Sequence, residues 1–190
     1  TMVYEGTRAV EAYAKQYDGF GFFAGSALDL TPYEWLIFHI NIGETVDAKF
    51  TVDFWYQDDP INILPGVEIS PFVVGGQLEP GAWHQVAVPL STLNPKGGLI
   101  DQVNINFRGM GEASFYLDEV RFVAKRLPTT PTPTPLPDLS PEAFEAGHVV
   151  YDDALNADVG WSLDPWSGTA DLNASASVFE GSNAIEVSIE

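Results

Sequence analysis

Seven polar or aromatic side chains occupy alternate positions in three segments of this chain. They are His39 and Asn41, then Asp53 and Trp55, then Asn104, Asn106 and Arg108. Apolar residues lie between them, so these side chains are expected on the side of a sheet that faces away from the core. Carboxylate, amide and guanidinium groups bond sugar hydroxyls, and an indole ring stacks on the apolar face of a pyranose. The pattern indicates a carbohydrate-binding face, with Tyr13 at its border. The alternative is that another segment covers this face and buries Trp55.

The elements that must position these side chains are predicted to be strands. Alternation of apolar residues predicts strands over 35–42, 49–56, 83–90, 102–108 and 115–123, the last with Phe115, Leu117, Val120 and Phe122 inward. The only helix-like stretch, 141–147, is short, and Gly21 between two phenylalanines is interpreted as a turn glycine. Many short strands without long helices predict an all-β fold, an antiparallel β-sandwich of two sheets.

The composition excludes several functions. The chain has 27 acidic and 8 basic residues, a formal charge of -19, which repels phosphate backbones and anionic lipids. Nucleic acid and membrane partners are therefore not expected, whereas a neutral polysaccharide is compatible. The absence of cysteine excludes disulfides and sulfur-ligated zinc. The three histidines lie in unrelated contexts, and no pair of carboxylates is distinctive, so we predict no catalytic residues and no enzyme activity.

A proline-rich segment divides the chain. Residues 127–137 read LPTTPTPTPLP, which favours an extended polyproline rod. Tethers of this composition are typical of secreted multi-module proteins, so we expect an extracellular or cell-surface location. The predicted organisation is a β-sandwich body over 1–126, a linker over 127–147 and a further segment over 148–190.

An internal repeat links the two ends of the chain. Residues 178–187, VFEGSNAIEV, align with residues 3–12, VYEGTRAVEA. The chain is therefore interpreted as one period of a tandem array opened inside a module. The body lacks its opening strands, and residues 148–190 either begin the next repeat or complete a sandwich by fold-back or exchange. Residues 3–15 and 178–190 are expected to compete for one strand position.

Several short motifs carry a family resemblance. They are YDD at 151–153, GW at 160–161, EGSNAI at 180–185, WLIF at 35–38, WHQVAVPL at 83–90 and FYLDEV at 115–120. In that order, the chain resembles the galactose-binding-like β-sandwich carbohydrate-binding modules, and is similar to family 11 modules. The resemblance implies a jelly roll whose concave sheet binds a β-glucan or a similar polysaccharide. It also implies a structural calcium, with Asp118 and Asp152 or Asp153 as ligands and a backbone carbonyl at Gly6 or its duplicate Gly181.

Two functions follow. The first is a non-catalytic carbohydrate-binding module of a secreted multi-module protein. The alternative is a structural module of an extracellular filament or surface layer, in which residues 149–190 complete a neighbouring copy by strand addition. Trp35 and Trp83 are expected in the core, and Trp161 and Trp166 to be more open.

Overall fold

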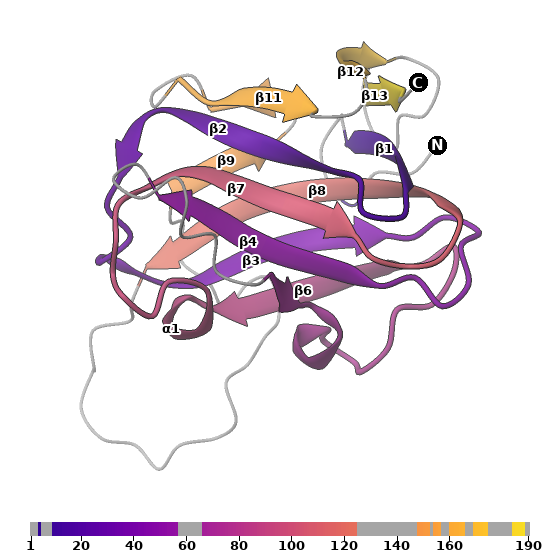
Figure 1. Ribbon diagram of the computed structural model, residues 1–190, viewed down its shortest axis with the longest axis horizontal. Helices are drawn as coiled ribbons and strands as arrows, with labels where there is room; N and C mark the ends of the chain where they lie inside the picture. The colour runs from indigo at the N-terminus through magenta and orange to yellow at the C-terminus, as the bar shows by residue number, and fades with distance from the viewer. Residues whose placement is uncertain are drawn as a thin grey trace.

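Two β-sheets packed face to face make up the fold (Figure 1). The computed structural model describes Tyr4 and residues 9–56, 66–124, 148–152, 154–156, 160–165, 169–174 and 184–188. Within these residues every strand pair is antiparallel except one, which confirms the predicted β-sandwich. No helix in these ranges is long and apolar enough to cross a membrane.

We call the five-stranded sheet, which lies in front in Figure 1, sheet B, and the other sheet A. The order of sheet B is β11 (Ser162–Pro165), β2 (Gly19–Leu28), β7 (Ile100–Phe107), β4 (Phe50–Tyr56) and β5 (Val67–Glu68). The short helices η1 (Ser70–Phe72) and α1 (Leu90–Leu93) lie in the connections. The central position of β7, between β2 and β4, decides which side chains share the outer face.

Sheet A is organised around the long strand β8 (Glu112–Ala124). One edge of β8 pairs with β3 (Tyr33–Asn41), which pairs in turn with β6 (Trp83–Pro89). The other edge pairs first with β1 (Val10–Lys15) and then with β9 (His148–Asp152). The remaining strands are β10 (Ala154–Leu155), β12 (Thr169–Ala174) and β13 (Ala184–Ser188). The strands after residue 148 thus lie along the edges of the body.

The core fills the space between the sheets. The inward residues of β3, β4 and β7 are those that the alternation predicts, and all are at most 1% exposed: Leu36, Phe38, Ile40, Phe50, Val52, Phe54, Val103, Ile105 and Phe107. Aromatic rings join the sheets, as in the edge-to-face pair of Phe50 and Phe115, whose centroids are 4.8 Å apart. Each such side chain stabilises the fold by about 1.5–3 kcal/mol. Trp161 is also buried in this core, so the expectation that it is more open was wrong.

A bulge in β8 keeps its apolar residues on one face. Ile37 pairs with Arg121 and His39 with Asp118, so one residue of β3 lies opposite two of β8. Glu119, in the bulge, has a φ of 54°, which is uncommon for a residue with a side chain. Before the bulge the inward residues of β8 have odd numbers, and after the bulge they have even numbers. Phe115, Leu117, Val120 and Phe122 are therefore all buried, as predicted.

Gly21 lies inside strand β2, so its interpretation as a turn glycine was wrong. It pairs with Asn104 of β7, and a Cβ at Gly21 would lie 2.6 Å from the Asn104 Oδ1, closer than real Cβ contacts. The Gln102 side chain occupies the same space. Glycine is required here because two amide side chains of the neighbouring strand lie across its backbone.

Candidate ligand-binding surface

The outer face of sheet B carries a layer of polar side chains on β4 and β7. We call Asp53, Gln102, Asn104 and Asn106 the amide layer. All four are buried, between 0% and 7% exposed, although they lie on the side of the sheet away from the core. Asp53 is the register partner of Asn104, and Asn106 of Thr51, so the layer crosses two neighbouring strands.

Asp53 holds the amide layer together. Its Oδ1 accepts a hydrogen bond of 2.8 Å from the Asn104 Nδ2, and its Oδ2 accepts one of 2.7 Å from the Asn106 Nδ2. Burial raises the pKa of Asp53, while the bonds from Asn104 and Asn106 and the charge of Arg108 lower it. The two amides are therefore fixed in orientation, and the Asn104 Oδ1 must face away from Asp53.

The amide layer also contains unsatisfied polar atoms. The Gln102 Nε2 and Oε1 and the Asn104 Oδ1 are buried without a hydrogen-bond partner among the described residues, as is the Oγ1 of neighbouring Thr51. A buried polar atom left without a partner costs about 1–3 kcal/mol. Buried polar groups of native proteins are nearly always bonded, so a row of such atoms requires an explanation. A ligand that both donates and accepts hydrogen bonds supplies one.

Sequence reasoning missed Gln102. Gln102 lies two residues before Asn104, and alternate residues of a strand share a face, so both lie on the outer face of β7. The same two-residue spacing that pointed to Asn104 and Asn106 could have identified Gln102. Gln102 is the register partner of Trp55 on one side and of Phe23 on the other. It therefore lies between the two aromatic residues of this face.

Trp55 and Phe23 form an aromatic pair above the sheet. Their ring centroids are 6.5 Å apart with an interplanar angle of 81°, an edge-to-face arrangement. Strand β7 separates their strands, and adjacent strands lie about 4.8 Å apart, so the rings lean toward each other across Gln102. Trp55 remains 36% exposed. The amide layer beside it, by contrast, is buried.

Arg108 lies at the end of the same face. Its backbone N donates to the Lys49 carbonyl at 2.7 Å, and its guanidinium carbon lies 5.9 Å from the centre of the Tyr17 ring. Arg108 lowers the pKa of Asp53 through its charge. A positive charge thus lies close enough to Asp53 to offset part of the cost of that buried carboxylate.

His39, Asn41 and Tyr13 lie on sheet A, so the structure does not bring them together with the other candidates. The Asn41 Oδ1 accepts a hydrogen bond of 2.9 Å from the Gly43 N, which fixes a turn. The ring of Tyr4 stacks on His39 at 3.5 Å between centroids, and burial, followed by the charge of Arg121, lowers the pKa of His39 to about 3. The expected single face is therefore two faces, one on each sheet.

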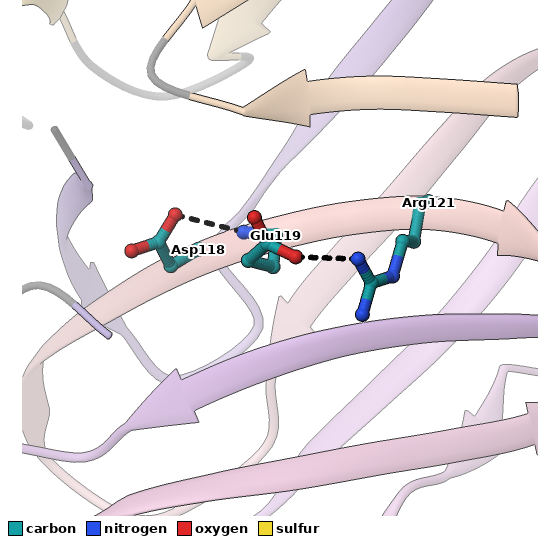
Figure 2. A network of polar contacts seen from close by, with 3 residues as sticks. All are labelled: Asp118, Glu119 and Arg121. Carbon is teal, nitrogen blue, oxygen red and sulfur yellow. Dashed lines mark hydrogen bonds and ion pairs between the residues drawn. The ribbon is translucent and has the colours of Figure 1, made fainter. Parts of the chain in front are cut away.

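Asp118, the first predicted calcium ligand, lies at the bulge of β8 (Figure 2). Its Oδ1 accepts a bond of 2.8 Å from the Glu119 N, and its Oδ2 accepts one of 2.9 Å from the Tyr4 N. Glu119 in turn pairs with Arg121 at 2.6 Å. The strand containing Asp152 is beside β8, but the side chains of Asp152 and Asp153 and the whole of Gly6 and Gly181 lie outside the described residues. Among described residues no three candidate ligands gather. The calcium site stays a prediction.

Comparison with known proteins does not assign the chain to a family. No protein-family model matches the chain, and no curated protein has a similar sequence.

Proposed function

We propose that this protein binds a neutral polysaccharide on the outer face of sheet B, with Trp55 and the amide layer as its site. The observation that carries the proposal is the row of buried, unsatisfied amide atoms of Gln102 and Asn104 beside a partly exposed tryptophan. No catalytic step is proposed.

The chemistry of the unsatisfied atoms favours a polyhydroxylated ligand. The Gln102 Nε2 needs an acceptor, and the Gln102 Oε1 and Asn104 Oδ1 need donors. A hydroxyl group both donates and accepts, so neighbouring hydroxyls of one sugar can satisfy all three atoms once the side chains that bury them move aside. The aromatic pair of Trp55 and Phe23 supplies an apolar surface for the C–H face of the same ring.

The charge of the chain favours a neutral ligand over an acidic one. At a formal charge of -19 an anionic polysaccharide is repelled at long range, and Asp53 lies within the amide layer itself. A β-glucan or another uncharged chain meets no such barrier. The setting that we propose is extracellular, in a secreted multi-module protein whose modules are joined by the proline-rich segment 127–137.

Native affinity electrophoresis tests this proposal. The protein is run through gels that contain a soluble β-glucan, xyloglucan or mannan, with polygalacturonate as the acidic comparison. We expect retardation by at least one neutral polysaccharide and none by polygalacturonate. Unchanged mobility in all the neutral gels would contradict the proposal.

A further inference from the structure

Tyr17 is an exposed aromatic residue at the opposite end of the outer face of sheet B from Trp55. It is 68% exposed, and the guanidinium carbon of Arg108 lies 5.9 Å from the centre of its ring. Arg108 continues the outward positions of β7, two residues after Asn106, and its backbone bond to Lys49 extends the β7–β4 pairing by one step. The Tyr17 ring therefore lies beside the last polar side chain of the face that carries the amide layer.

The backbone of Tyr17 has a conformation that tyrosine rarely adopts. Residues 15–18 form a turn in which the Asp18 N donates to the Lys15 carbonyl at 2.9 Å, and Tyr17, at the third position, has a φ of 74°. A positive φ at this position is normally supplied by glycine or asparagine, because most side chains crowd the backbone there. The turn itself therefore gives no reason for a tyrosine. Residues in sparsely populated conformations concentrate at binding sites, so the ring is expected to serve contacts outside the turn.

Backbone hydrogen bonds on both sides hold this turn against β7 and the hairpin that follows it. The Tyr17 N donates to the Phe107 carbonyl at 3.0 Å, and the Phe107 N donates to the Asp18 carbonyl at 2.9 Å. The Gln16 N donates to the Gly111 carbonyl at 3.1 Å. The ring is thus presented to solvent from a fixed backbone. A ring held in this way loses little conformational entropy when a ligand stacks on it.

The distance from Trp55 to Tyr17 sets the length of a ligand that contacts both. Trp55 is the register partner of Gln102, and Arg108 lies beside Tyr17. At about 3.4 Å per residue, the rise along β7 from residue 102 to residue 108 is about 20 Å. A single sugar ring is much shorter than this. One ligand therefore reaches both aromatic residues only if it is a chain of several sugar units.

The surface between the two ends is suited to such a chain. The outward positions of β2 beside Asn104 and Asn106 are Gly21 and Gly19, so β2 carries no side chain there. The amide groups of Gln102 and Asn104 lie across Gly21 instead. A linear chain along β7 meets polar groups at successive steps and an aromatic ring at each end, once the side chains that bury the amide layer have moved aside.

We propose that Tyr17 is a second stacking platform of this face, so that the site takes a linear chain of several sugar units along β7, with Trp55 at one end and Tyr17 at the other. The inference rests on the proposed polysaccharide binding and deepens it. The ligand is an internal stretch of a polysaccharide or a long oligosaccharide, and not a single sugar or a disaccharide. Arg108 supplies hydrogen-bond donors to the hydroxyls of the sugar that stacks on Tyr17.

Titration calorimetry with oligosaccharides of increasing length tests the inference. The ligands are β-glucan, xyloglucan and mannan oligosaccharides, each from disaccharide to octasaccharide. We expect the affinity of wild type to increase with length until one molecule reaches both rings. The variant is Tyr17→Gly, because glycine adopts the positive φ of this position without strain. It should bind the longest oligosaccharide about three- to tenfold more weakly than wild type, and the shortest one that wild type binds equally well. Tyr17→Phe keeps the ring and is the control, expected to bind every length as wild type does.

The outcomes separate this inference from the proposed function. Equal affinity of wild type and Tyr17→Gly for the longest oligosaccharide would overturn the inference and leave binding at Trp55 intact. An equal loss of affinity for every length would also overturn it, because a ring at one end of the site acts only on ligands that reach it. If wild type binds no oligosaccharide, the proposed function fails and this inference fails with it. Circular dichroism checks that the variants fold, and Tyr17→Asn replaces the glycine variant if that one does not, because asparagine also tolerates a positive φ.

Discussion

Asn104 of β7 and Asp53 of β4 are register partners in sheet B, and the Asn104 Nδ2 donates a 2.8 Å hydrogen bond to the Asp53 Oδ1. This bond decides the orientation of the Asn104 amide, because the nitrogen must face the carboxylate. The oxygen is thereby left for another partner, and it has none among the described residues. The structural bond and the proposed binding atom therefore belong to one side chain.

Replacing Asp53 should destabilise the protein. In Asp53→Ala the Nδ2 groups of Asn104 and Asn106 lose their acceptor while they stay buried, and hydrogen bonds to a charged group contribute about 1.5–3 kcal/mol each. Removal of a buried carboxylate offsets part of this loss, so we expect the free energy of unfolding at pH 7, from urea denaturation, to fall by about 2–4 kcal/mol. Glu34→Ala, which removes an exposed carboxylate from β3, is the control and should change it by less than about 0.5 kcal/mol. Equal stability of Asp53→Ala and wild type would show that the bonds do not hold the face.

His39 should make stability depend on pH between 6.5 and about 3. Its folded pKa lies below its ordinary value, so the unfolded chain takes up a proton in this window and the folded chain does not. Stability is full above pH 6.5 and decreases as the pH falls, by at most about 1.4 kcal/mol per pH unit. The raised pKa of Asp53 acts in the opposite direction, because its charged form is the one that burial disfavours.

A variant separates these two effects. His39→Phe keeps a flat ring beneath Tyr4 but takes up no proton, so its urea-unfolding profile should be flatter than that of wild type from pH 6.5 toward pH 3. The control is His84→Gln. His84 lies on β6, where its Nε2 accepts a hydrogen bond from the Glu79 N, and it pairs with Ile40 of β3. If wild type and His39→Phe have parallel profiles, His39 is not the group responsible.

Calcium is the third test. We propose, from the family resemblance, that Asp118 is one ligand of a structural calcium, since calcium prefers carboxylate oxygens. An ion that binds only the folded state raises the melting temperature. We expect wild type to melt at a higher temperature in calcium than in chelator, and Asp118→Asn to lose this difference while Glu34→Gln keeps it. Identical melting of wild type in calcium and in chelator would remove calcium from the account.

The alternation of apolar and polar residues predicted the strands and their inward residues, because a strand that buries one face has an apolar residue at every second position. It could not predict which sheet each strand joins. His39, Asp53 and Asn104 have the same pattern around them, yet β3 belongs to sheet A and β4 and β7 to sheet B. The side of a strand is a local property, whereas its sheet depends on pairing partners far along the chain.

Other features depended on contacts that a pattern does not contain. Gly21 has the neighbours of a turn glycine, but it is small because Gln102 and Asn104, about eighty residues later, lie across it. The sequence around His39 is that of a residue on a binding face, but in the structure the ring of Tyr4 stacks on the His39 ring. The repeat, in contrast, was visible in the sequence, but the parallel register that joins its two copies was not.

The central claim is that a neutral polysaccharide binds at Trp55, and titration calorimetry with the polysaccharide that retards the protein tests it most directly. Loss of an aromatic stacking contact is expected to weaken binding by at least about tenfold, which is about 1.4 kcal/mol. The control is Trp83→Ala, which removes a half-buried tryptophan from β6 of sheet A. We predict that Trp55→Ala loses binding while it remains folded, and that Trp83→Ala binds as wild type does. Unchanged affinity of a folded Trp55→Ala variant would contradict the account.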